Sequence, residues 1–254
     1  MKSPLRVISV ITTLITLIIN SLAVILPLNN RTTAQISNSF GSYFVPANYV
    51  FGIWGIIYLG LIAYSIYQFT KKGREDSTVD KIAPLFILSN IANSVWIFMW
   101  QYGHYNLSLV IMIVLLITLI LIYSYLNIGS EKVSRIKFWM VNIVFSIYLG
   151  WITVATIANV TDTLISDGFN GFGIQPRIWS AILVAVATIL TLVIIRIKKD
   201  IAYSFVIVWA LVGILIKFKD IRMISYTAFI GCIFILGWLL YTIWSENKVK
   251  NIKN

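Results

Sequence analysis

Charged residues, histidine and cysteine are all scarce in this chain. Of 254 residues only 11% are charged, and there is one histidine and one cysteine. The single cysteine, Cys232, allows no intramolecular disulfide and no thiolate metal cluster. Soluble domains are typically about a quarter charged and about half apolar, whereas this chain is 59% hydrophobic with a mean hydropathy of +0.89. The composition excludes a soluble domain and indicates a membrane protein.

The few charges are mostly positive, with a formal net charge of +11 at pH 7. In a soluble chain this excess would suggest nucleic acid. Here the charges form short runs between apolar stretches, where they act on orientation and on anionic lipid headgroups. The sequence has no G-x-S-x-G motif, no phosphate-binding glycine loop and no Cys/His nucleophile pair. We expect no nucleic-acid partner, no metal and no cofactor, and an ordinary hydrolase or NTPase is not supported.

Long apolar segments predict eight membrane-spanning helices. A bilayer core of about 30 Å needs about 20 apolar residues per helix, and the segments lack the alternation of barrel strands. The first segment is longer than the apolar part of a signal peptide, so we expect it to be retained. The seventh is the weakest because its 16 residues are slightly under the usual range. The predicted spans are Leu5 to Leu28, Tyr49 to Phe69, Ile82 to Trp100, Leu107 to Leu126, Phe138 to Val160, Ile178 to Ile195, Ile201 to Ile216 and Met223 to Trp244.

The distribution of positive charge favours cytoplasmic positions for both termini. In that orientation 15 of the 20 Lys and Arg residues lie on the inside, as membrane proteins generally arrange them. The exception is the KFKDIR loop, Lys217 to Arg222, between the last two spans. If the seventh segment did not cross, this loop would be cytoplasmic and the C-terminus would lie outside. That alternative stays open.

The sequence changes character after about Asn159. Before this point polar and aromatic residues are spaced helically, and after it the spans are plain Ile/Leu/Val segments. We therefore predict an all-α integral membrane protein with a five-helix domain at residues 1–165 and a three-helix extension at residues 166–254. We expect the first part to fold without the second. No repeat between the halves is found, which weakens a transporter built from inverted repeats.

Ionisable residues are absent from the middle of every predicted span. Proton relays and pumps usually place such groups there, so an ion-coupled transporter loses support. His104 stands alone in the loop QYGHYN, and we interpret it as solvated. Asp162 and Asp167 follow the fifth predicted span and could pair as acid and base. Nothing in the sequence orients them, so we interpret both as solvated loop residues.

Aromatic and amide side chains form stripes on three predicted helices, at spacings that place them on one helix face. If the stripes meet, flat rings line a pocket and a few amides orient a polar edge of a ligand. In the alternative, the rings pack between helices or form interfacial belts, as expected of Trp100 and Tyr102, and the asparagines bond to neighbouring helices. The stripes are Phe51, Trp54 and Tyr58; Asn93, Trp96 and Trp100; and Tyr148, Trp151, Ala155 and Asn159.

Three segments resemble motifs of the TspO/MBR family, the tryptophan-rich sensory proteins related to the mitochondrial translocator protein. FVPANYVFGIWGIIYLGLIAY is similar to the family pattern F-x-P-P-x-W-V-F-x-x-x-W-x-x-x-Y, with Ala47 for the second proline and Tyr49 for the first tryptophan. SNIANSVWIFMW resembles L-N-x-x-W-x-x-x-F, and YLGWITVATIAN resembles Y-L-x-W-V-x-F-A-x-x-L-N. The matched residues are Phe44, Pro46, Val50, Phe51, Trp54 and Tyr58; Asn93 and Trp96; and Tyr148, Leu149, Trp151, Ala155 and Asn159.

The resemblance covers roughly residues 5 to 165. It implies a TspO-like five-helix transmembrane bundle whose pocket opens toward the first outside loop and binds porphyrins and other flat hydrophobic molecules. The stretch NVTDTLISDG lacks the tyrosine and arginine of the steroid-binding segment in animal members, so cholesterol transport is not expected. The ligand-binding residues implied are Phe51, Trp54, Asn93, Trp96, Trp151, Ala155 and Asn159.

Three functions stay open. The first hypothesis is a membrane sensor or carrier for porphyrins (tetrapyrroles) or similar planar compounds, without enzymatic turnover. The second is a light-dependent porphyrin-degrading membrane enzyme, and the third is a permease for a small apolar solute. We expect a multi-pass protein of a prokaryotic cell (inner) membrane. Its expected partners are the lipid bilayer and a hydrophobic small molecule, and a homodimer stays open.

Overall fold

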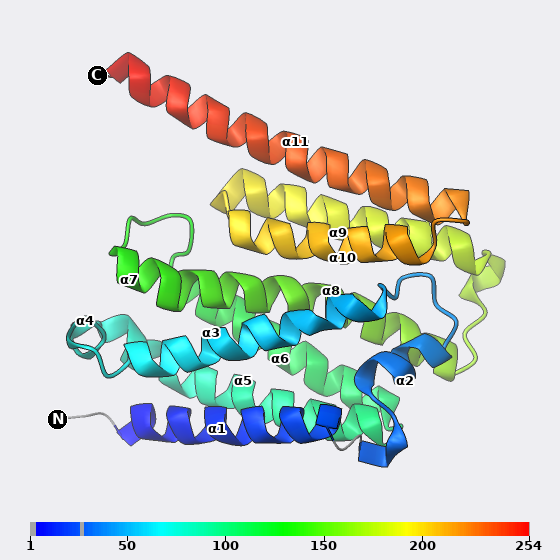
Figure 1. The fold of residues 1–254 in the computed structure, drawn as a ribbon, viewed down its shortest axis with the longest axis horizontal. Helices are drawn as coiled ribbons and strands as arrows, with labels where there is room; N and C mark the ends of the chain where they lie inside the picture. The colour runs from blue at the N-terminus through cyan, green and yellow to red at the C-terminus, as the bar shows by residue number, and fades with distance from the viewer. Residues whose placement is uncertain (1–3, 26–27, 254) are drawn as a thin grey trace.

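The protein is a bundle of long helices (Figure 1). A computed structural model describes residues 4–25 and 28–253, apart from the side chains of 246, 247 and 249–253, and this part contains no strand. Lys2 and the end of the first predicted span, at residues 26–27, lie outside the described residues. The long helices are α1 (Pro4–Ile25), α3 (Ile53–Tyr67), α5 (Ser77–Gln101), α6 (Tyr105–Tyr125), α8 (Ile143–Ser166), α9 (Pro176–Lys198), α10 (Ile201–Lys217) and α11 (Arg222–Lys253). The short ones are η1 (Leu28–Asn30), α2 (Thr33–Ser39), η2 (Asn48–Gly52), α4 (Lys71–Glu75), α7 (Arg135–Lys137), η3 (Phe138–Asn142) and η4 (Gly171–Gly173).

Within the described residues, seven helical segments are long and apolar enough to cross a membrane, and α10, with 17 residues, is shorter. α10 nevertheless runs from one end of the bundle to the other, as the longer helices do. Asp200, just before it, accepts a hydrogen bond from Tyr123 near the end of α6 (2.8 Å). The Gly213 carbonyl in its last turns accepts one from the Ala47 N–H, just before η2 (3.2 Å). The prediction of an all-α, multi-pass membrane protein is confirmed.

We expect a reporter fused to the C-terminus to lie in the cytoplasm and one inserted between Lys217 and Arg222 to lie outside. The reason is that α1 begins and α11 ends at the same end of the bundle, on the left in Figure 1, as an even number of crossings requires. A reporter between Lys71 and Asp76 is a cytoplasmic control in either topology. A C-terminal reporter on the outer side would contradict the crossing by α10.

The buried face of α1 is polar and its exposed face is apolar. Ser, Thr and Asn side chains lie on the buried face, whereas large Val, Ile and Leu side chains are exposed. The Asn90 amide of α5 donates to Thr13 Oγ1 (3.0 Å), and the Thr16 hydroxyl donates to the Asn90 carbonyl (2.9 Å). Lipid provides no hydrophobic force between helices, so close packing and hydrogen bonds between small polar residues hold them together. The apolar face of α1 is suited to contact lipid.

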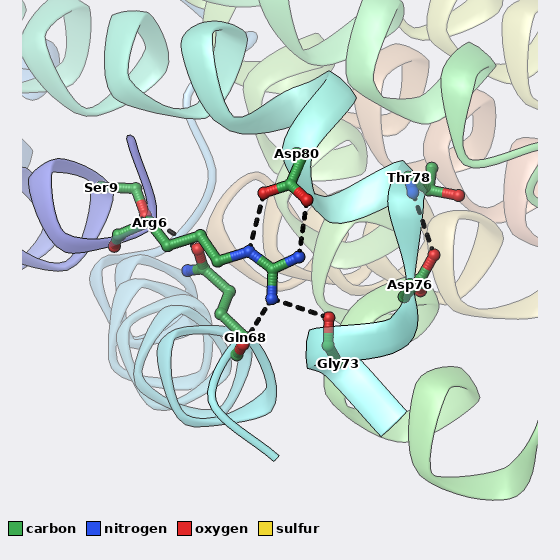
Figure 2. Close-up of polar contacts among 7 residues, drawn as sticks. All are labelled: Arg6, Ser9, Gln68, Gly73, Asp76, Thr78 and Asp80. Atoms are coloured by element: carbon green, nitrogen blue, oxygen red, sulfur yellow. Dashed lines mark hydrogen bonds and ion pairs between the residues drawn. The ribbon is translucent and has the colours of Figure 1, made fainter. Parts of the chain in front are cut away.

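A buried arginine differs from the sequence interpretation, which counts Arg6 simply among the cytoplasmic charges. Arg6 is only 4% exposed. Its Nε and Nη2 donate to the Asp80 carboxylate at 2.7 and 2.8 Å, and its Nη1 donates to the carbonyls of Gln68 and Gly73, both at 2.9 Å (Figure 2). One guanidinium therefore joins α1, the end of α3, α4 and the start of α5.

A second ion pair lies at the same end of the bundle. Lys137 Nζ is 2.8 Å from Asp76 Oδ2, and the Thr78 backbone N–H donates to Asp76 Oδ1 at 3.1 Å (Figure 2 shows the Thr78 contact). Burial raises the pKa of Asp76, but the contacts with Lys137 and Thr78 outweigh burial and hold this pKa below its ordinary value. The Asp76 carboxylate is therefore charged at neutral pH, and it fixes α7 to the turn between α4 and α5.

The last three helices form a layer on one side of the bundle, at the top of Figure 1, in which α10 packs against α8. Gly150 permits this approach, and Gly213 permits α10 to pack closely against the segment around η2. A Cβ on Gly150 of α8 would lie 3.0 Å from Val206 Cβ, and a Cβ on Gly213 of α10 would lie 2.3 Å from Val50 Cγ2. The division into domains between residues 165 and 166 stays a prediction. A first part that folds separately would lose this close interface.

Candidate ligand-binding site

A cavity lies beside α2, which Figure 1 shows at the end of the bundle opposite the start of α1. It is lined by residues of α2, the segment around η2, α3, α5 and α8. Its volume is about 40 Å³, which is room for about three water molecules at roughly 10–15 Å³ each. Its walls must therefore move apart before a larger molecule is bound. The lining residues are Thr33, Ser37, Pro46, Phe51, Trp54, Trp96, Trp100, Trp151, Val154, Ala155, Ala158, Asn159 and Asp162.

Five aromatic rings dominate the cavity walls. Trp96 lies between Trp54 (centroids 6.0 Å apart, planes at 28°) and Trp100 (6.2 Å, 21°), so three indoles form a row of nearly parallel rings. Trp151 meets Trp54 edge to face at 6.2 Å, and Phe51 meets Trp151 in the same way at 5.8 Å. Rings in these arrangements offer flat faces on which another planar molecule can stack. The shape and chemistry of the walls suit a flat, apolar ligand.

The helix α2 covers the outer end of the cavity. It begins with a capping box, in which the Thr32 hydroxyl accepts from the Gln35 N–H and the Gln35 side chain accepts from the Thr32 N–H. This start fixes the helical register, so that Thr33 and Ser37, four residues apart, lie on the same face and line the cavity. The loop that the sequence places outside the membrane therefore supplies part of the wall.

Six of the seven residues predicted to bind ligand line this one cavity. They come from three segments that are far apart in the sequence, which supports the prediction that the aromatic stripes meet. Whether they contact a ligand stays a prediction. The six are Phe51, Trp54, Trp96, Trp151, Ala155 and Asn159.

Asn93 is the predicted site residue that the structure does not bring to the cavity. It is 1% exposed, and its side-chain nitrogen donates to Tyr148 Oη (2.9 Å). Its side-chain oxygen accepts from the Asn20 amide (2.7 Å). Both polar atoms of Asn93 thus hold α1, α5 and α8 together, which is the packing alternative that the sequence left open.

Asp162 corrects the interpretation of this carboxyl as a solvated loop residue. α8 continues to Ser166, beyond the predicted end at Val160, so Asp162 lies within the helix and is 0% exposed. Its Oδ2 accepts a hydrogen bond from the Ser37 hydroxyl of α2 (3.0 Å). Extending the helical spacing of Trp151 and Asn159 by one more turn would have placed Asp162 on the cavity face. Asp167 is exposed, as predicted, and accepts from Asn106 (3.1 Å).

Trp100 corrects a second sequence interpretation, that of an interfacial belt residue. It is 3% exposed and lines the cavity, and its indole nitrogen lies 3.5 Å from the Thr33 carbonyl. Tyr102, two residues later, is 53% exposed and fits the belt interpretation. The i, i+4 spacing from Trp96 was the signal that identified the correct face for Trp100.

Metal-binding clusters are absent from the part of the chain that the structure describes, where no three His, Cys, Asp or Glu side chains gather closely enough to hold an ion. His104 is exposed at the start of α6, as expected of a solvated residue. The polar groups of the cavity are suited to hydrogen bonding.

The fold and the cavity define a multi-pass helical membrane protein with an aromatic site between its helices. A family model described as TSPO-like protein matches residues 6–241. The chain belongs to this family. The match continues into the last three helices, beyond residues 5 to 165 that the motif resemblance covers. No curated protein and no solved structure matches the chain. Family membership supports a general role as a membrane sensor or ligand-binding protein.

Proposed function

We propose that this protein is a membrane sensor or carrier that binds a planar hydrophobic ligand of the porphyrin class in the aromatic cavity, in the membrane of a prokaryotic cell. The observation that carries the proposal is the convergence of four tryptophans and Phe51 from three distant segments on one cavity. Packing alone does not require this. Aliphatic side chains can fill a helix interface without burying indole N–H groups.

Binding requires the cavity to widen, and the row of indoles suggests how. If Trp54 moves outward, a flat ring can enter the row between Trp54 and Trp96 and stack on both indoles. Trp54 is suited to this movement because it is only partly buried, whereas Trp96 and Trp151 are 4% and 3% exposed. The ligand would then lie between Trp54 and Trp96, with Trp151 beside it.

We expect Trp54→Ala and Trp151→Ala to weaken binding of protoporphyrin IX by roughly three- to tenfold or more. Each change removes a stacking ring, whose contribution is about 0.5–1.5 kcal/mol beyond the area it buries. The measurement is quenching of protein fluorescence during titration of the full chain in detergent, in the dark. Trp238→Ala is the matched control, because Trp238 is 41% exposed on α11, away from the cavity.

Equal affinities for the wild type, Trp54→Ala and Trp151→Ala, all correctly inserted, would return the rings to a role in helix packing. Illumination after saturation distinguishes the enzymatic alternative, in which an excited porphyrin is degraded and products form. Absence of any saturable binding would favour the permease.

A further inference from the structure

Buried polar atoms without partners gather around the cavity. Nine buried side-chain nitrogen and oxygen atoms have no hydrogen-bond partner among the described residues, and four of the nine line this cavity. Leaving such an atom unpaired is unfavourable, so an external partner is the expected explanation. The four are the indole nitrogens of Trp96 and Trp151, Oδ1 of Asn159 and Oδ1 of Asp162.

On α8, the unpaired donor of Trp151 and the unpaired oxygen of Asp162 lie at different depths along the helix. Trp151 is eleven residues before Asp162, which corresponds to about 16 Å along the helix axis. The unpaired donor from α8 is thus at one end of the lining and the carboxylate at the other. Ala155 and Ala158 lie between them along α8, and Phe51 and Trp54 pack against Trp151. A bound molecule therefore meets apolar walls along its length and an acceptor at the end covered by α2.

Asp162 is the strongest polar group in this arrangement. It is fully buried within a membrane-spanning helix, where a carboxyl group is costly and marks a functional site by default. Ser37 occupies Oδ2 of Asp162, the other oxygen, Oδ1, has no partner, and Asp162 lines the cavity. The cation that interacts with it electrostatically is Lys217 of α10. The Lys217 ammonium donates instead to the Asn38 side chain, so it does not occupy Oδ1 of Asp162.

We propose that Asp162 anchors a protonated nitrogen, and that the cavity selects planar aromatic cations over neutral or anionic molecules of the same shape. This inference rests on the proposed function and specifies the ligand class. The Asp162 carboxyl group offers a hydrogen-bond acceptor, and a cation bound beside it favours its negatively charged form. The faces of the surrounding indoles also attract cations. A ligand carboxylate beside Asp162 would be repelled in this water-poor site. A tetrapyrrole would have to place its acidic groups away from Asp162.

Three probes with the same three-ring skeleton test this: 9-aminoacridine, which is a cation at neutral pH, neutral 9-anthracenemethanol, and the anion anthracene-9-carboxylate. We expect the wild-type chain in detergent to bind the cation at least tenfold more tightly than the neutral probe, and the anion most weakly. Equal affinities for the three probes would overturn the role of Asp162. This comparison needs no variant.

Variants then assign the preference to the residue. Asp162→Asn should weaken cation binding at least tenfold and leave the affinity for the neutral probe within about threefold. Ser37→Ala retains the carboxylate and should retain the preference. Asp167→Asn is the matched control, because Asp167 is an exposed carboxyl five residues further along the chain. An unchanged preference in correctly inserted Asp162→Asn would also overturn the proposal.

The two proposals fail in different ways. If the neutral probe binds and is displaced by protoporphyrin IX, but the cation has no advantage, the aromatic site stands and the role of Asp162 fails. If neither protoporphyrin IX nor any three-ring probe binds, the proposed function fails and the inference fails with it.

Discussion

Replacing Arg6 by methionine should lower the melting temperature of the purified protein by roughly 5–10 °C. The change removes both hydrogen bonds to the Asp80 carboxylate and leaves the carbonyls of Gln68 and Gly73 without their donor. Breaking a buried charged contact of this kind costs about 2–3 kcal/mol, allowing for the partial exposure of Asp80. For a chain of this length each 1 kcal/mol corresponds to about 2–4 °C.

The control for this prediction is Arg74→Met, which removes an exposed arginine from the neighbouring α4. It removes the same charge from the same end of the bundle and should change the melting temperature little. If Arg6→Met and Arg74→Met melt alike, the buried network in Figure 2 does not stabilise the junction of α1, α3 and α5.

Replacing Gly213 by leucine should both destabilise the protein and weaken ligand binding. A Cβ at this position would lie 2.3 Å from Val50 Cγ2 and 3.0 Å from Pro46 Cβ, so the segment around η2 must shift. Overpacking of this kind typically costs about 1–3 kcal/mol. Pro46 and Phe51 line the cavity from the same segment, so the shift also moves the wall on which a planar ligand stacks.

Gly237→Leu is the matched control for Gly213→Leu. Gly237 lies on α11, and a Cβ there meets no atom within 4 Å. We expect the control to retain its melting temperature and its affinity for protoporphyrin IX. A Gly213→Leu protein that matches the control in both measurements would show that α10 does not support the cavity. Loss of stability with unchanged affinity would limit α10 to a role in packing.

Much of the fold could be predicted from local sequence patterns. Long apolar segments identified the spanning helices, because a bilayer accepts few other structures and the required length is set by its thickness. Helical spacing placed Trp54, Trp96 and Trp151 on the correct faces, since the period of 3.6 residues is a property of the backbone itself. The order of the motifs indicated the family, and the family model that covers residues 6–241 confirms it.

The pairing of helix faces could not be predicted in the same way. Asn93 carries the same type of amide as Asn159, and both lie on stripes of the predicted pocket. In the structure Asn93 bonds to Asn20 and Tyr148, whereas Asn159 lines the cavity. The difference depends on which helices are neighbours at that depth, and the sequence of a single helix does not contain this information.

The sequence by itself determined that this chain is a helical membrane protein with aromatic stripes, because hydrophobicity and helical spacing act over a few turns. Only the tertiary structure decided that Arg6 is buried, that Trp100 lines the cavity and that Asp162 lies within a helix opposite Ser37. The Ser37–Asp162 hydrogen bond joins residues 125 positions apart. In a bilayer both lipid and neighbouring helices accept apolar side chains, so hydrophobicity does not distinguish a lipid-facing helix face from a packed one. Polar contacts between distant segments make that distinction.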